Sequence, residues 1–348
     1  MTTISVIVPV YNGEATLGKT LASAQTQTHR DIEIIVVDDG SRDSSAAIAE
    51  AAAETDNRIT VLRTGNHGVA AARNAAIEHA TGEFIAPLDA DDLWHPRKLE
   101  LQLHAFASCP NDTVLAYNWF VPVGAADQIL TRPRMPVVSG AVYYRHLDYN
   151  FISNGSTPLV RRDALQGLRY DAELAANGVG GCEDYLFQLA LALRGRFTCV
   201  PAFLTGYRKV GGGMSSKVEQ MLRSHIAVLG QRRRQGPRDA SDIIDRRLAE
   251  FEAQLARHRI RRGRILGAGM AAVRGALRSP KALTRQISED FATLRIGKAS
   301  KPPRDDALTQ RKFPTADPFE AIGVPIPPER RARLAPLEPR DLAGTYLD

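Results

Sequence analysis

The residues with the clearest chemical potential are three carboxylates within four positions, Asp89, Asp91 and Asp92. Like charges this close repel one another, and burying them unpaired is costly, so a cation or water must offset them. Carboxylate oxygens on a loop suit a hard cation such as Mg²⁺ or Mn²⁺, which could also hold a phosphate. Because an Asp-x-Asp pair is common, a solvated acidic loop without a ligand is the alternative.

Short apolar runs precede the acidic positions and predict buried strands. These runs are Ile4–Val10, Ile32–Val37, Ile59–Arg63 and Phe84–Leu88. The segments between them have helical spacing or are rich in alanine; one helix should start near Ser41–Asp43, whose side chains can cap it. Alternating strands and helices predict a doubly wound, mostly parallel sheet, whose ligands bind beyond the carboxyl ends of the strands.

Four loops should meet at the carboxyl ends of these strands. They are Tyr11-Asn12, Asp38-Asp39-Gly40, Asn66-His67-Gly68 and the loop from Asp89 to Asp92. The sequence has neither a Gly-x-Gly-x-x-Gly pattern nor a P-loop that would hold phosphates with backbone amides. Acidic loops without such a phosphate-binding loop indicate that a metal bridges a pyrophosphate.

The composition is typical of a soluble globular protein, with 44% hydrophobic and 24% charged residues. Three cysteines, with no Cys-x-x-Cys pair, argue for a reducing compartment and against a disulfide framework or a zinc site. No basic leader with a cleavage site is visible, and the uncharged run from Thr113 to Ala126 is too short to span a membrane. We therefore expect a cytoplasmic protein.

Five segments, in order and at matching spacing over about the first 100 residues, resemble the family 2 glycosyltransferases. They are Val8-Pro-Val-Tyr-Asn-Gly13, Gln25-Thr-Gln-Thr28, Val37-Asp-Asp-Gly-Ser41, Ala72-Arg-Asn-Ala75 and the stretch from Gly82 to Asp92. The resemblance implies the GT-A fold, a nucleotide-diphosphate sugar donor, a divalent cation (Mn²⁺ or Mg²⁺) and inversion at the anomeric carbon.

The resemblance also implies roles for the loop residues. Pro9 and Tyr11 would flank the nucleobase, Asp39 would accept a hydrogen bond from a base N–H, and Asp38 would support its loop. The nucleotide site would also include Asn12, Asn66 and Gly68. A turn or helix-cap role is the alternative for Asp38 and Asp39.

In the acidic loop, the resemblance places Asp89 on the ribose side and makes Asp91 the ligand of the metal on the β-phosphate. We expect Asp92 to face solvent or to start a helix, and Trp94 to pack in the core.

Later segments carry a sparser resemblance. The stretch from Asn154 to Leu165 resembles the strand and turn that follow the variable acceptor-side insertion. The stretch from Gly181 to Leu189 resembles the Glu-Asp segment of the family, which makes Asp184 the catalytic base. Apolar spacing predicts that a helix starts here, so charge complementing the helix dipole is the alternative role, which we favour for Glu183.

The stretch from Gly206 to Ser216 resembles the Tyr-Arg and Ser loop that closes over the diphosphate, with a glycine triplet where many members carry bulkier residues. The sequence lacks the Gln-x-x-Arg-Trp mark of processive synthases, so we expect a non-processive enzyme.

The chain divides by composition into three parts. Residues 1–217 would form the catalytic domain, with a nucleotide-sugar half (1–110) and an acceptor half (111–217). Residues 218–300 would form a basic helical extension, and the proline-rich residues 301–348 a disordered or extended tail.

The extension carries more positive charge than its share of the chain. The whole chain has a net charge of +6, whereas residues 251–298 hold eleven Lys/Arg against three Asp/Glu. We expect residues 257–298 to lie on an anionic membrane surface; a solvated or body-packed helix is the alternative. The side chains expected to face lipid are Ile260, Ile265, Leu266, Met270, Val273 and Leu277. Nucleic acid is not an expected partner, since no aromatic residues are interleaved with the basic ones.

The sequence therefore predicts an inverting glycosyltransferase acting in cell-surface polysaccharide or glycolipid synthesis. The donor would be a nucleotide-diphosphate sugar, a UDP-sugar by default, and the acceptor a saccharide or lipid-linked saccharide. Two alternatives stay open. A nucleotidyltransferase would need a basic loop near the start of the chain, where Pro-Val-Tyr-Asn stands. A non-catalytic scaffold of an envelope-assembly complex would not bind nucleotide in a metal-dependent way.

Overall fold

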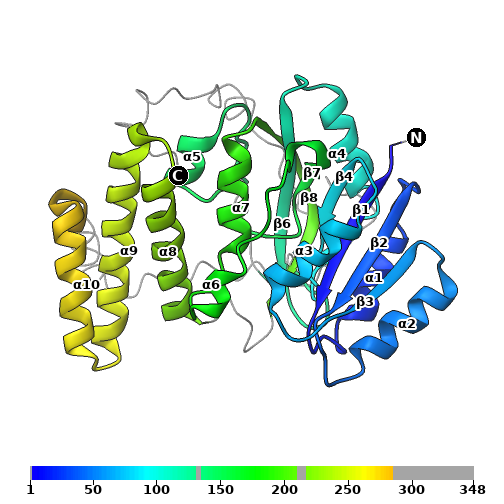
Figure 1. Cartoon of the computed structure of the whole chain (residues 1–348), viewed down its shortest axis with the longest axis horizontal. Coiled ribbons are helices and arrows are strands. Elements are labelled where there is room, and N and C mark those ends of the chain that lie inside the picture. Colours follow the sequence, from blue (N-terminus) through cyan, green and yellow to red (C-terminus); the bar gives the residue numbers. More distant parts are fainter. Residues whose placement is uncertain (1, 131–134, 210–216, 285–348) are drawn as a thin grey trace.

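The four apolar runs form the parallel half of a sheet in the computed structural model, which describes residues 2–130, 135–209 and 217–284 (Figure 1). The strands are β1 (Ile4–Val10), β2 (Ile32–Asp38), β3 (Ile59–Arg63) and β4 (Phe84–Pro87), in the spatial order β3-β2-β1-β4. Every residue of β1 is buried, as expected for a strand covered on both faces. The predicted strand–helix alternation is confirmed here.

The other half of the sheet is mixed in direction. The sheet continues from β4 through β7 (Leu159–Arg161), β6 (Thr113–Val123), β8 (Arg196–Arg208) and β5 (Leu93–Trp94). The β6–β8 pair is parallel, whereas the β4–β7, β7–β6 and β8–β5 pairs are antiparallel. Within the described residues the sheet has eight strands and is more mixed than the sequence pattern alone indicated, because the short strands β5 and β7 run antiparallel to their neighbours.

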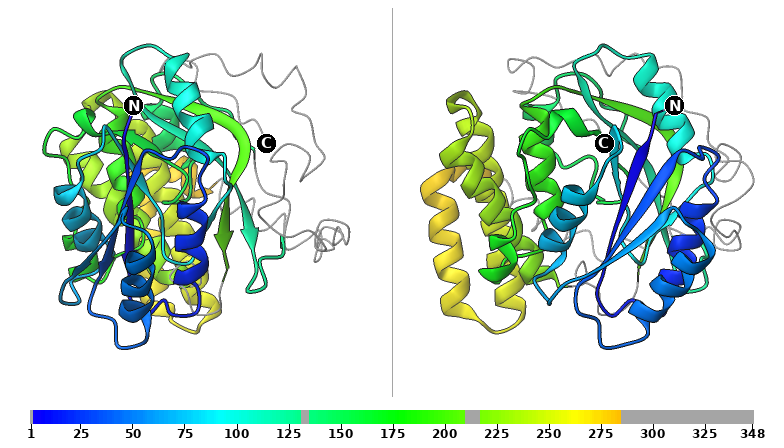
Figure 2. Two further views of the ribbon diagram at one scale, coloured as in Figure 1. Left: turned by 90° about the vertical axis from the view of Figure 1, so that its right-hand side faces the viewer. Right: turned by 45° about the vertical axis from the view of Figure 1, so that its right-hand side comes forward.

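Helices cover both faces of the sheet (Figure 2). Alternate residues of a strand point to opposite faces, so Val6 and Val8 of β1 share a core with α1 (Leu17–Gln25), α2 (Ser45–Thr55) and α4 (Lys98–Ala107). Ile7 faces the other core, with α3 (Val69–His79) and α7 (Glu183–Ala192). Two short helices, α5 (Tyr143–Asp148) and α6 (Glu173–Ala176), lie on the α7 side.

The helix expected to start near residues 41–43 begins at Ser45. The Asp43 carboxylate accepts hydrogen bonds from the Ser45 backbone N–H (3.0 Å) and hydroxyl (2.6 Å). The Ser41 hydroxyl instead accepts the Asn12 N–H at 3.0 Å, which joins the loops after β1 and β2. Of the predicted capping residues, Asp43 therefore satisfies the helix start and Ser41 positions the neighbouring loop.

The expected helical extension is present as far as the description reaches. It consists of α8 (Val218–Gln235), α9 (Ser241–Arg261) and α10 (Ile265–Arg278), side by side beyond α7 with α10 outermost (Figure 1). Gly263, whose φ is +72°, makes the reversal between α9 and α10. The proline-rich stretch 301–348 lies outside the described residues. Within the described ranges no helix has the length and hydropathy needed to cross a bilayer.

Candidate active site

Hydrogen bonds join the loops at the carboxyl ends of the strands. The Gly13 N–H donates to the Ser45 hydroxyl at 2.8 Å, and the Arg42 N–H donates to the Asn12 side-chain carbonyl at 2.8 Å. Asn12 has a φ of 51°, a left-handed conformation that asparagine tolerates better than most residues. Tyr11, in the same turn, is 45% exposed, whereas Pro9 is buried within β1. The first two predicted nucleotide loops are thus in contact.

Asp39 organises the loop after β3. Its carboxylate is buried and accepts hydrogen bonds from the Thr64 hydroxyl and the His67 N–H, both at 3.0 Å, and from the Gly68 N–H at 2.7 Å. Gly68 has a φ of +89°, which favours glycine. Asn66 lies exposed in this loop. Asp39 therefore stabilises the loop after β3 through these three hydrogen bonds.

Asp38 is buried at the end of β2. Its Oδ1 accepts the Ser41 N–H at 3.1 Å, and its Oδ2 lies 3.7 Å from Nε of Arg63. Its contacts therefore hold the loop between β2 and α2.

Asp92 does not face solvent, so that expectation is wrong. The side chain is fully buried and accepts hydrogen bonds from Asn154 Nδ2 (3.1 Å), the Ser156 hydroxyl (2.6 Å) and the Arg208 backbone N–H (3.0 Å). Burial, and then the charges of Asp91 and its neighbour Asp89, raise the pKa of Asp92 well above its ordinary value. Asp92 therefore anchors the acidic loop to β8 and to the turn before β7. Trp94 is fully buried, as predicted.

Arg208, in the segment that resembles the Tyr-Arg and Ser loop, also contacts the acidic loop. Its guanidinium is buried and donates to the carbonyls of Asp91 (2.8 Å) and Gly124 (2.7 Å), and it forms an ion pair with Asp127 at 2.6 Å. Although burial acts to raise it, hydrogen bonds from Lys19 and Arg208 keep the pKa of Asp127 below its ordinary value. Arg208 therefore supports the backbone of the acidic loop. The glycine triplet that follows lies outside the described residues.

Arg73, on α3, is the cation at the centre of the site. It forms an ion pair with Asp89, lies 5.2 Å from the centroid of the Tyr170 ring, and is almost fully buried. A Cβ added at Gly155 would lie only 3.1 Å from an Arg73 guanidinium nitrogen and 3.2 Å from an Asp89 oxygen. The glycine therefore leaves room for this ion pair.

Among the described residues, Asp91 has fewer hydrogen-bond and ion-pair partners for its carboxylate than Asp89 or Asp92 has. Among the described residues no other residue donates a hydrogen bond to its side chain, and burial, followed by the charge of Asp89, raises its pKa to about 6. Within the described ranges no three His, Cys, Asp or Glu side chains form a metal-binding group. One carboxylate completed by phosphate oxygens is nevertheless a usual ligand set for Mg²⁺. The oxygen chemistry at Asp91 thus fits a divalent cation shared with a diphosphate.

Asp184 lies in the first turn of α7, where the sequence predicted a helix start. Burial raises its pKa to about 6; the Arg73 guanidinium acts to lower this pKa, whereas Glu183 and Asp89 raise it further. Glu183 is buried, and its Oε2 accepts the Gly181 N–H at 2.9 Å. This hydrogen bond stabilises the turn before the helix. Asp184 is therefore within the electrostatic influence of Arg73, the cation that pairs with Asp89.

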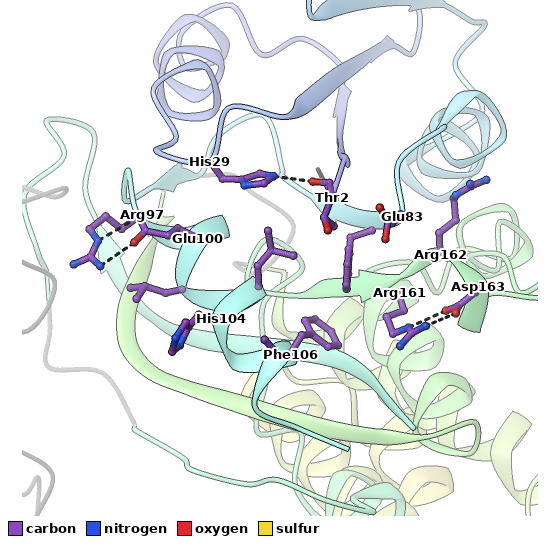
Figure 3. Close-up of a pocket in the computed structure, with 14 residues that line it drawn as sticks. Thr2, His29, Glu83, Arg97, Glu100, His104, Phe106, Arg161, Arg162 and Asp163 are labelled. Atoms are coloured by element: carbon purple, nitrogen blue, oxygen red, sulfur yellow. Dashed lines mark hydrogen bonds and ion pairs between the residues drawn. The ribbon is translucent and has the colours of Figure 1, made fainter. Parts of the chain in front are cut away.

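A groove of about 1210 Å³ lies at the end of the sheet opposite the acidic loops (Figure 3). Thr2 and Glu83, which line it, precede β1 and β4, so the groove lies at the amino ends of these strands. Its Arg97 and Arg161 pair with neighbouring acidic residues. None of the predicted site residues lines this groove, and the acidic loops are therefore the better candidate for chemistry.

Sequence reasoning assigned no role to several residues that shape the site. Arg73 stood inside the Ala72-Arg-Asn-Ala75 motif, so the motif itself was the available signal. Asn154 and Ser156 stood inside the stretch from Asn154 to Leu165 that resembles the family, whereas no local pattern marks Asp127. Each of the three residues makes a contact that spans more than 60 positions of sequence.

Comparison with known proteins relates the chain to glycosyltransferases. Residues 5–159 match the model of glycosyl transferase family 2. A 142-residue stretch is 44% identical to an uncharacterized glycosyltransferase of Rickettsia conorii, and an 89-residue stretch is 46% identical to the glycosyltransferase GlyA of Streptococcus pneumoniae. These matches cover 41% and 26% of this chain but only 23% and 13% of the relatives.

Two solved structures share the fold. Residues 1–349 of S. aureus TarS, in complex with UDP-GlcNAc, align with a TM-score of 0.58 at 17% identity, covering 80% of this chain and 92% of that one. The mannosyltransferase PcManGT of Pyrobaculum calidifontis, in complex with GDP-Man and Mn²⁺, aligns with a TM-score of 0.55 at 20% identity, covering 84% and 80%. Residues 5–159 of this chain are thus similar to glycosyl transferase family 2, and its fold is of the GT-A type.

Proposed function

We propose that this chain is a non-processive, inverting glycosyltransferase that moves a sugar from a nucleotide-diphosphate sugar to an acceptor hydroxyl. The observation that carries the proposal is the ion pair of Asp89 in the acidic loop with buried Arg73, whose charge also acts to lower the pKa of Asp184 on α7. Sugar transfer needs a bound donor and a general base within one site. The acidic loop would contact the donor, and α7 would carry the base.

Asp184 is the proposed general base. A carboxylate with a pKa of about 6 is ionised near neutral pH, yet it accepts a proton more readily than an ordinary aspartate. It would take the proton of the acceptor hydroxyl as the oxygen attacks the sugar C1. One displacement at this carbon inverts its configuration, so an α-linked donor would give a β-linked product.

Asp91 is the proposed ligand for Mn²⁺ or Mg²⁺. A cation bound there would offset the negative charge of the departing nucleoside diphosphate. The structure of PcManGT with GDP-Man and Mn²⁺ supports a divalent metal, and those of TarS with UDP-GlcNAc or UDP support a nucleotide-sugar donor. The hydrogen bonds of Asp92 and Arg208 would keep the Asp91 backbone in place during turnover.

The loops after β1, β2 and β3 would hold the nucleoside. Tyr11 is exposed enough to stack on a base, with Pro9 and Asn12 shaping its turn. The Asp39 oxygens already accept three hydrogen bonds, but a carboxylate has about four acceptor sites and can also accept a base N–H. Asp38, Asn66 and Gly68 belong to the same loops, and Asp89 would lie beside the ribose.

The acceptor in this proposal is a saccharide or lipid-linked saccharide. The reaction would take place in the cytoplasm, during synthesis of a cell-surface polysaccharide or glycolipid. A UDP-sugar is the default donor.

The test is a panel of nucleotide sugars assayed for hydrolysis with Mn²⁺, with Mg²⁺ and with a chelator. We expect one class of donor to be hydrolysed in a metal-dependent way, and Asp91→Asn to abolish that hydrolysis. A protein that binds no nucleotide sugar with either metal would refute the proposal and favour the non-catalytic scaffold. Release of pyrophosphate from a nucleoside triphosphate would favour the nucleotidyltransferase.

A further inference from the structure

Helix α10 buries its small residues and exposes its large ones. Ala268, Ala271 and Gly275 are buried in the packing of α10 against α9. A Cβ added at Gly275 would lie 3.3 Å from the Ala249 carbonyl oxygen, so glycine allows this close approach. On the other side Leu266 is 87% exposed and Leu277 is 81% exposed. A globular helix normally has the reverse arrangement, with its large apolar side chains toward the core.

The exposed apolar residues of α10 form one stripe. Leu266, Met270, Val273 and Leu277 follow one another at intervals of four, three and four, which places them on one face of a helix. At about 100° per residue, the three buried small residues lie on the opposite face. Ile260 and Ile265, both more than half exposed, extend the apolar surface at the α9–α10 reversal. Contiguous exposed apolar surface of this kind marks an interaction site.

Positive charge surrounds this stripe. Residues 257–281 contain eight Lys/Arg and no Asp/Glu. Four of these cations pair with acidic residues: Arg259 and Arg264 with Glu219, Arg274 with Glu252, and Arg278 with Asp245. Arg261 and Arg262, at the end of α9, and Lys281, after α10, are exposed and have no ion-pair partner within the described ranges. The cations without acidic partners thus lie near both ends of the stripe.

We propose that this face docks on an anionic lipid bilayer, with α10 lying in the plane of the interface. We define the α10 face as the stripe Leu266, Met270, Val273 and Leu277 together with Arg261, Arg262 and Lys281. An apolar stripe with flanking cations is the pattern of helices that insert into the boundary between lipid headgroups and acyl chains. Figures 1 and 2 show α10 as the outermost helix, with α9 between it and α8, so the stripe can reach a flat surface.

A second copy of the chain fits this face less well. A symmetric pair of α10 faces would bring the cations of both copies together, and like charges facing one another destabilise an interface. An anionic bilayer complements both the charge and the apolar stripe. The proposal needs neither the metal nor the sugar transfer, so it stands or falls independently of the proposed reaction.

The test is co-sedimentation of the full chain with vesicles of phosphatidylcholine, with or without phosphatidylglycerol. We expect binding only to the anionic vesicles, weakening steeply as NaCl rises above about 0.1 M, where charges are screened beyond about 10 Å. Leu266→Ser/Leu277→Ser should lower partitioning by about 100-fold. Arg261→Glu/Arg262→Glu should lower it by about 30-fold or more.

Matched controls lie on other helices. Leu193→Ser removes a leucine that is 46% exposed at the end of α7, and Arg223→Glu/Arg234→Glu reverses two exposed charges on α8. Thermal unfolding by circular dichroism confirms that each variant is folded. The full chain failing to bind anionic vesicles, or the controls losing as much binding as the α10 variants, would overturn the proposal. So would a dimer in solution that Leu266→Ser/Leu277→Ser dissociates, because the face would then be a self-interface.

Discussion

Replacing Asp184 by asparagine should inactivate the protein and stabilise it at the same time. Asparagine keeps the size of the side chain but cannot accept a proton, so transfer should fall by about two to four orders of magnitude. In the unsubstituted protein, activity should rise with pH through about 6 and level off above it, because only ionised Asp184 is a base. The groups that set this pKa besides burial are Arg73, Glu183 and Asp89.

The expected gain in stability follows from the same pKa. Its rise from 3.8 to about 6 means that ionised Asp184 costs the folded state up to about 3 kcal/mol. Since the folded-state pKa lies above the unfolded-state value, protonated Asp184 favours folding below about pH 4, and this contribution is lost as the pH rises through about 6. Asparagine is neutral throughout, so it should raise the free energy of unfolding by about 1–3 kcal/mol near pH 8 and change it little near pH 4.

The assay is urea unfolding of both proteins at the two pH values, beside transfer kinetics. Glu183→Gln is the matched control, because glutamine can still accept the Gly181 N–H and should keep most activity. A loss of stability on Asp184→Asn near pH 8 would refute the reasoning, since the attraction to Arg73 would then outweigh desolvation. Full activity of Asp184→Asn would place the base elsewhere. If Glu183→Gln were inactive at the same time, Glu183 and not Asp184 would be the base.

Three further predictions concern single contacts. Asp91→Asn should remove the Mn²⁺ dependence of UDP binding in calorimetry; equal UDP affinity of the unsubstituted protein with and without Mn²⁺ would contradict this. Arg208→Met should lower the free energy of urea unfolding by about 3 kcal/mol, because the partly buried Asp127 carboxylate loses its ion pair with Arg208. Adding Asp127→Asn should restore part of this loss. Gly275→Val should lower stability by about 1–3 kcal/mol in thermal unfolding through its contact with α9, whereas Gly269→Val, with open space around it, should not.

Local elements could be predicted from the sequence because their signals are local. The apolar runs matched β1 to β4 closely, and the segment between the third and fourth runs, expected to be helical, contains α3. The helix start at Glu183 was equally visible, since apolar spacing and first-turn acidic residues lie within a few positions of one another. The meeting of the four loops at the carboxyl ends of the strands could be predicted from the strand–helix alternation, because parallel strands can be connected in only a few ways.

The environment of each charge could not be predicted in this way. Asp91 and Asp92 are adjacent carboxylates with the same chemistry, yet Asp92 is fully buried. The turn before β7 and strand β8 bring hydrogen-bond donors to it from positions 154 and 208. Arg208 faces the acidic loop for the same reason. Partners so far apart in sequence meet only when the sheet has formed, so no local pattern records them.

Helix α10 shows both contributions in one element. Its sequence alone determined that large apolar and small residues occupy opposite faces, because helical periodicity sorts side chains by position. Which face is buried was decided by tertiary packing. Gly275 lets the α10 backbone approach α9 closely, and that close approach is possible only on the small-residue face, so Leu266 and Leu277 are left toward solvent.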